Sequence, residues 1–227
     1  KQILGYRFLV QIIGLLFFLV LSVFSWIYFK ERILCFDPAF FLFKMIEYGD
    51  FSIELGRWGS VPSQLLPLWA IKNGWSLGTV VKLYSVSFIL LYYIYFLIIT
   101  VVLKNNNAGM ALLLALCLGF RHSFYYSTAE LYQGMALAFI LWALIDPQKE
   151  YNSAIKKWIA VLLSMAVIFI ISFYHQLAFF AVFFILIAAV LDKKNYTNFL
   201  LITPLAFAII WFFIRVFLLT GTNYEKE

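Results

Sequence analysis

The sequence predicts an all-α fold, a polytopic bundle of about seven transmembrane helices that forms a single domain over residues 1–227. Two observations on the composition and one on its pattern predict this. Of the 227 residues, 65% are hydrophobic and only 12% are charged, whereas soluble domains carry about 25% charged residues. The apolar residues fall in long runs, and lysines cluster in the short segments between them. A chain of this size exposes much of its surface, so lipid must surround most of that surface.

The apolar runs define the expected spans, because a helix needs about 20 residues to cross the hydrocarbon core of a bilayer. The first run is long enough to cross and no A-x-A site follows it, so it predicts an anchor rather than a cleaved signal. The third and fourth runs are short, and tilted, broken or re-entrant helices are alternatives for them. The seven candidate spans are Phe8–Phe29, Leu77–Leu103, Ala108–Phe120, Ala129–Ile145, Trp158–Phe173, Leu177–Leu191 and Phe199–Leu219.

The positions of the lysines predict the orientation. One set of alternate short loops carries six of the twelve lysines, whereas the opposite short loops carry little besides Arg121. The positive-inside rule places the lysine-rich side in the cytoplasm together with the N-terminus. The 146–157 and 192–198 loops are then inside, and the 30–76 segment and the 121–128 turn are outside. The lysines concerned are Lys104, Lys149, Lys156, Lys157, Lys193 and Lys194.

The outer segment 30–76 predicts two short amphipathic helices lying at the membrane interface. The first follows Asp37 and Pro38 and ends before Gly49. Asp is a favoured N-cap, Pro a favoured first helical residue and Gly a favoured residue after a helix. The second helix falls in the stretch SQLLPLWAIKNG, after a polar loop that contains Glu54 and Arg57. We therefore expect apolar helices that lie along the membrane surface.

Ionisable residues gather on this outer side, where each has a functional and a purely structural interpretation. Arginine can bind a phosphate through two parallel hydrogen bonds, which favours Arg57 and then Arg121 as ligands of a lipid phosphate. In the structural interpretation Asp37 only caps a helix, and Glu54 and Arg57 form an exposed ion pair of small value. Arg121 and His122 then only anchor a helix end, His175 ends another helix, and Glu130 complements a helix dipole.

Several classes of site are not indicated. The two cysteines, Cys35 and Cys117, are far apart and belong to no metal-binding spacing, and no metal site is predicted. There is no P-loop, G-x-G-x-x-G or G-x-S-x-G motif. The net charge of +6 comes largely from loop lysines, so nucleic acid is not an expected partner.

The order of these segments resembles the GT-C superfamily of polytopic membrane glycosyltransferases, which includes protein mannosyltransferase-like and aminoarabinose transferase-like members. The resemblance covers roughly residues 8–191. It depends on a first span followed by a large outer loop that opens near an Asp. It depends also on the stretches LALCLGFRHSFYYSTAELYQGMALAFILWAL and ISFYHQLAFFAVFFIL, which look like later spans. In the outer loop it is carried by Asp37-Pro38-Ala39-Phe40-Phe41, Gly56-Arg57-Trp58 and Pro62 to Trp69.

The resemblance implies an enzyme that moves a sugar from a polyprenyl-phosphate donor to an acceptor at the outer face of the membrane. By position, Asp37 would be the catalytic base, and a divalent metal is left open as a cofactor. Pro38 departs from the second acidic residue that many members place beside this Asp, and the sequence includes no C-terminal outer domain. The expected location is the bacterial inner (plasma) membrane. The candidate substrate-binding residues are Arg57, Glu54, Arg121, His122 and His175.

The alternative is a non-catalytic membrane scaffold or lipid-binding subunit on the same fold, because a fold does not fix a function. Its partners would be membrane lipids and protein subunits of a membrane complex.

Overall fold

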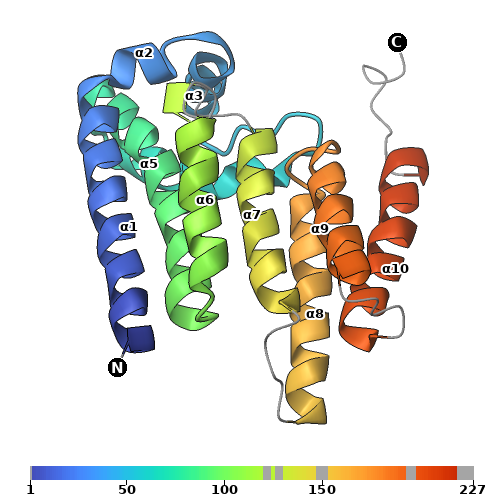
Figure 1. Cartoon of the computed structure of the whole chain (residues 1–227). Coiled ribbons are helices and arrows are strands. Elements are labelled where there is room, and N and C mark those ends of the chain that lie inside the picture. Colours follow the sequence, from blue (N-terminus) through green and yellow to red (C-terminus); the bar gives the residue numbers. More distant parts are fainter. Residues whose placement is uncertain (1, 120–123, 126–129, 147–152, 193–197, 219–227) are drawn as a thin grey trace.

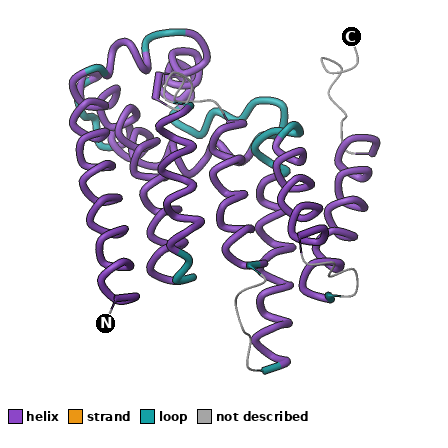
Figure 2. Tube along the Cα trace, in the orientation of Figure 1, coloured by secondary structure: helices purple, strands orange, loops and turns teal. Residues whose placement is uncertain are grey.

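The fold is a row of apolar helices, as predicted. The computed structural model of the protein describes residues 2–119, 124–125, 130–146, 153–192 and 198–218, and the regular elements in these ranges are all helical (Figure 2). Successive long helices stand side by side and alternate in direction, and the two ends of the chain lie at opposite ends of the row (Figure 1). These helices are α1 (Gln2–Ile27), α5 (Leu77–Leu97), α6 (Asn106–Leu118), α7 (Glu130–Ile145), α8 (Ala154–Ile171), α9 (Ala178–Asp192) and α10 (Phe199–Phe213).

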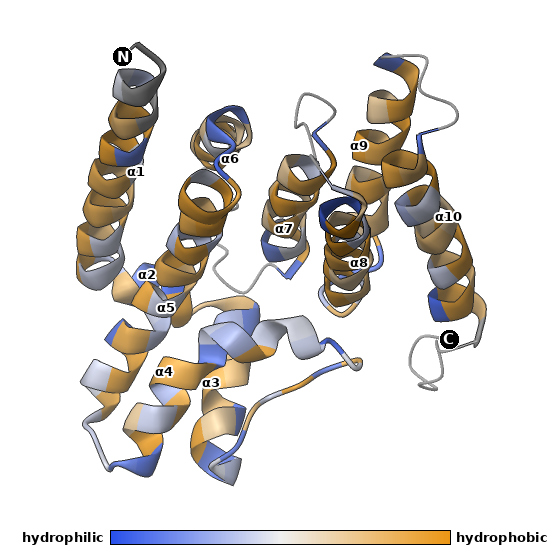
Figure 3. Cartoon of the chain, turned by 90° about the horizontal axis from the view of Figure 1, so that it is seen from below, coloured by the Kyte–Doolittle hydropathy of each residue, from blue (hydrophilic) through white to orange (hydrophobic). Residues whose placement is uncertain are grey.

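Four helical segments are long and apolar enough to cross a membrane: Phe8–Ile27, Leu77–Val102, Ala154–Ile171 and Phe199–Phe217. The second and fourth each extend an α-helix by a π-helical turn, over Ile98–Val102 and Ile214–Leu218. Helices α6, α7 and α9 are apolar but shorter, with 13, 16 and 15 residues. Apolar residues cover these helices on most sides (Figure 3). The chain is therefore a helical membrane protein, and the crossing of all seven helices stays a prediction.

Helix α7 lies in the middle of the row and is the most buried of the long helices. It contacts α6 on one side and α8 and α9 on the other. Small residues permit this close packing, as is usual between membrane helices. A Cβ atom added at Gly134 would lie only 3.1 Å from the Cβ of Tyr174 and 3.2 Å from that of Ala178. The surrounding protein covers this short helix, so it needs little lipid contact of its own.

The outer segment folds into three helices that project beside α5 at one end of the row (Figure 3). They are α2 (Phe29–Ile33), α3 (Phe36–Tyr48) and α4 (Val61–Lys72). Helices α3 and α4 confirm the two predicted helices, and α2 was not predicted. Gly49 ends α3 in the left-handed conformation, with φ 65°, as its position predicted.

The prediction that Asp37 caps α3 is wrong. The helix begins at Phe36, and Cys35 takes the N-cap position with extended backbone angles and no capping bond from its side chain. Phe36 has a φ of 52°, so the chain turns into the helix before it reaches Asp37. Asp37 instead lies exposed in the first turn, where the helix dipole favours a negative charge. Its carboxylate is therefore not committed to capping.

Helix α4 buries polar side chains beside apolar ones, and it exposes large apolar side chains on its other face. Ser63 and Gln64 are 1% and 0% exposed, whereas Leu65 and Trp69 are 54% and 53% exposed. Gln64 is buried because its amide holds the loop before the helix, as described below. An apolar outer face suits contact with lipid.

A buried arginine joins the outer segment to the bundle. Arg32 in α2 is fully buried, and its Nε donates to Ser85 Oγ at 2.8 Å while Nη2 donates to the Ser85 carbonyl at 3.1 Å. Ser25 in α1 donates to the same carbonyl at 2.7 Å. The guanidinium lies 4.0 Å from the centre of the Phe124 ring. These bonds fix α2 against α1 and α5.

Candidate functional site

The centre of the candidate site is an ion pair between Arg57 and Glu130. Arg57 Nη1 lies 3.0 Å from Glu130 Oε2, and the two side chains are 31% and 5% exposed. Glu130 is the first residue of α7, and its Oε1 atom is buried without a hydrogen-bond partner. A charged group at this depth needs a partner, and Arg57 supplies it from a loop 73 residues earlier.

The loop that carries Arg57 is held in place by backbone contacts. Gln64 accepts from the Ser52 N–H and donates to the Ser52 carbonyl, both at 2.8 Å. The Gly59 N–H donates to the Phe173 carbonyl at 2.9 Å. A Cβ atom on Gly59 would lie 2.4 Å from the Tyr174 ring, so only glycine permits this approach. Arg57 is therefore positioned by anchors on both sides of it.

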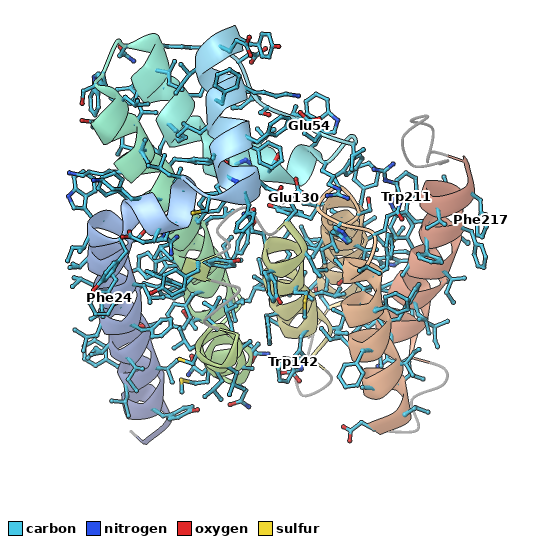
Figure 4. The ribbon with its side chains drawn as sticks, turned by 90° about the horizontal axis from the view of Figure 1, so that it is seen from above. Phe24, Glu54, Glu130, Trp142, Trp211 and Phe217 are labelled. Atoms are coloured by element: carbon cyan, nitrogen blue, oxygen red, sulfur yellow. The ribbon has the colours of Figure 1, made fainter. Side chains whose placement is uncertain are left out.

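Two further carboxylates surround this pair. Glu54 pairs with Lys44 of α3 at 2.5 Å, and the two side chains are 35% and 30% exposed. Asp37 and Glu54 both interact electrostatically with Glu130. Figure 4 shows Glu54 in the loop and Glu130 at the start of α7 in the same region of the molecule. The interpretation of Glu54 and Arg57 as a pair with each other is wrong, because each has a partner on another element.

His175 lies in the connection between α8 and α9 and lines a small cavity together with Arg57. Its Nδ1 accepts from the Leu177 N–H at 3.1 Å. Burial lowers the pKa of His175 below its usual value, and the positive charge of Arg57 lowers it further. The imidazole is therefore neutral at pH 7, with its proton on Nε2 because Nδ1 is an acceptor.

Four of the predicted site residues thus come together at one end of the bundle: Asp37, Glu54, Arg57 and His175. Arg121 and His122 lie outside the described residues, as does most of the 121–128 turn. Among the residues that the structure describes, no group of three His, Cys, Asp or Glu side chains could hold a metal ion.

Sequence reasoning missed the pairing of Glu130 with Arg57. The available signal was the position of Glu130 at the start of an apolar helix, where an unpaired carboxylate is costly. The sequence also gave no role to Arg215, which lies near the end of the last apolar segment.

The fold and this site define a helical membrane protein with a charged cluster at one end of its bundle. The chain matches no known protein family, no curated protein and no solved structure.

Proposed function

We propose that the protein is a glycosyltransferase that moves a sugar from a polyprenyl-phosphate donor to an acceptor at the outer surface of the membrane. The observation that carries this proposal is the pair of Arg57 with the buried Glu130, a carboxylate with which the exposed Asp37 also interacts electrostatically. The resemblance to GT-C glycosyltransferases supports the same assignment. In this proposal the protein resides in the bacterial inner membrane with its N-terminus in the cytoplasm.

The proposed reaction uses Asp37 as general base. The acceptor hydroxyl attacks the sugar carbon that carries the phosphate, and its proton passes to the Asp37 carboxylate. The bond from that carbon to the phosphate oxygen breaks, and the polyprenyl phosphate leaves with the electron pair. Arg57 stabilises the charge that develops on the leaving phosphate, because its remaining N–H groups are donors.

A scaffold or lipid-binding subunit is the second candidate. The two ion pairs of the site, Arg57 with Glu130 and Lys44 with Glu54, are satisfied within the protein. A cluster whose charges are paired internally can serve structure alone.

The test compares Asp37→Asn with Glu47→Gln, because Glu47 is another exposed carboxylate on α3. Membrane vesicles that contain each variant receive a panel of polyprenyl-phosphate sugars and an envelope extract as acceptor, and the release of free polyprenyl phosphate is measured. We expect Asp37→Asn to remove the release and Glu47→Gln to keep it, with equal thermal stability. Full release by Asp37→Asn would exclude Asp37 as the base. No release from any donor by the unaltered protein would favour the scaffold.

A further inference from the structure

A small cavity lies beside Arg57. Its volume is about 50 Å³, enough for a group of a few heavy atoms. It is formed by the loop before α4, the connection between α8 and α9, and the π-helical turn after α10. None of the described residues that line it is acidic. The lining residues are Leu55, Arg57, Ser172, His175, Gln176 and Arg215.

Arg215 is the second cation of this cavity, and it has no anionic partner among the residues that the structure describes. Its Nε atom is buried without a hydrogen-bond partner. Its guanidinium lies 5.7 Å from the centre of the Phe173 ring. A Cβ atom added at Gly56 would lie 3.8 Å from Nη2, so the guanidinium reaches the loop that carries Arg57. A charge on an apolar segment needs a partner or water, and the cavity has room for an anion.

The other lining groups also suit an anion. Arg57 donates one hydrogen bond from Nη1 to Glu130, and its other N–H groups remain as donors. His175 is a donor at Nε2, because its Nδ1 accepts from the backbone. Ser172 is occupied, since it donates to the Phe169 carbonyl at 2.6 Å and accepts from Trp211 Nε1 at 3.0 Å. Two guanidinium groups and a neutral imidazole therefore converge on the cavity, and Glu130, which pairs with Arg57, is not among its described lining residues.

We propose that Arg57 and Arg215, assisted by His175, bind the phosphate group of a lipid in this cavity. The lipid is indicated by the position of Arg215, which lies in the apolar segment Phe199–Phe217 that is long enough to cross a membrane. Only the identity of that lipid as the polyprenyl donor rests on the proposed function.

The test measures binding without any transfer. The protein is placed in nanodiscs of phosphatidylcholine, and the binding of radiolabelled polyprenyl phosphate is measured for the unaltered chain, Arg215→Gln and Arg215→Lys. The matched control is Lys72→Gln, which removes one exposed positive charge from the end of α4. Phosphatidylglycerol is the competitor, and thermal unfolding of each variant accompanies the binding assay.

We expect Arg215→Gln to weaken binding by about tenfold to a hundredfold, the range for a lost hydrogen bond to a charged group. Arg215→Lys keeps the positive charge but loses the planar fork of the guanidinium. We therefore expect this variant to fold normally and to bind polyprenyl phosphate less tightly than the unaltered chain. Lys72→Gln leaves binding within about twofold of the unaltered value, because surface charges are screened. Equal losses in Arg215→Gln and Lys72→Gln, or normal binding by Arg215→Lys and Arg215→Gln, would overturn the site.

The competitor identifies the source of the phosphate. Displacement only by excess polyprenyl phosphate supports the donor, whereas displacement by an equal amount of phosphatidylglycerol would overturn the assignment to the donor. Asp37→Asn is expected to bind polyprenyl phosphate normally. Its binding therefore separates a failure of this cavity from a failure of the proposed catalysis.

Discussion

The ion pair of Arg57 with Glu130 joins the outer loop to α7, and it is more buried than the pair of Lys44 with Glu54. Asp37, Glu54, Arg57 and His175 were all expected at one end of the bundle, because the positions of the lysines order the loops into two sets. Their partners were not predictable, since Glu130 and Arg57 are 73 positions apart and meet only through the packing of α7 against the outer loop.

The two ion pairs of the site should differ in their contribution to stability. Glu130 is 5% exposed and Glu54 is 35% exposed. We expect Glu130→Gln to lower the free energy of unfolding by about 1–3 kcal/mol, because it removes a charged hydrogen bond from a buried site. Glu54→Gln should cost less than about 1 kcal/mol, as exposed pairs do. Denaturant titration of both variants in detergent measures the difference. Equal costs would mean that burial does not set the strength of these pairs.

Helices were predicted more reliably than the connections between them. The apolar runs predicted the position of each long helix. In lipid the backbone N–H and C=O groups of an apolar run must pair with each other, and a helix achieves this within one segment. Helix α2 and the start of α3 at Phe36 were not predicted. Both depend on the backbone conformations of Leu34 and Cys35, and neither residue type signals a helix end or a helix start. The polar buried face of α4 was missed because Gln64 finds its partner in the preceding loop.

The loop that carries Arg57 should depend on the absence of a side chain at Gly59. We expect Gly59→Ala to destabilise the protein by about 1–3 kcal/mol, the range for overpacking. It should also displace Arg57, because a Cβ atom there would overlap the Tyr174 ring at 2.4 Å. Thermal unfolding measures the first effect, and the binding of polyprenyl phosphate measures the second.

Gly78→Ala is the control for that substitution. Gly78 lies in the first turn of α5, and a Cβ atom there would meet nothing within 4 Å. Alanine is the better helix former, so stability should stay the same or rise slightly. A Gly59→Ala variant as stable as Gly78→Ala would show that the loop does not pack on Tyr174 as described.

At the scale of the whole molecule, the bundle places the charged cluster and the N-terminus at opposite ends. Alternation of direction along the row produces this arrangement (Figure 1). The four long apolar segments, however, would give a different topology if they alone crossed the membrane. Helix α9, with 15 residues, is roughly 22 Å long, less than the hydrocarbon core of about 30 Å. It must therefore lie where the bilayer is thinned, or stop short of one surface.

Asp192 at the end of α9 distinguishes the two topologies. If all seven helices cross, Asp192 and Ser153 both face the cytoplasm, and Asp50 faces the outside. If only the four long segments cross, Asp192 lies on the outer side. The chain then reaches that side through α8, and α9 does not carry it back to the cytoplasm. Each position is exposed, and a single cysteine at each is introduced after Cys35 and Cys117 are changed to serine. In intact cells we expect an impermeant thiol reagent to label Asp50→Cys and to spare Ser153→Cys and Asp192→Cys, with all three labelled after the cells are opened.

Labelling of Asp192→Cys in intact cells would reduce the bundle to four spans. Labelling of Ser153→Cys there would reverse the orientation and move the charged cluster to the cytoplasmic side.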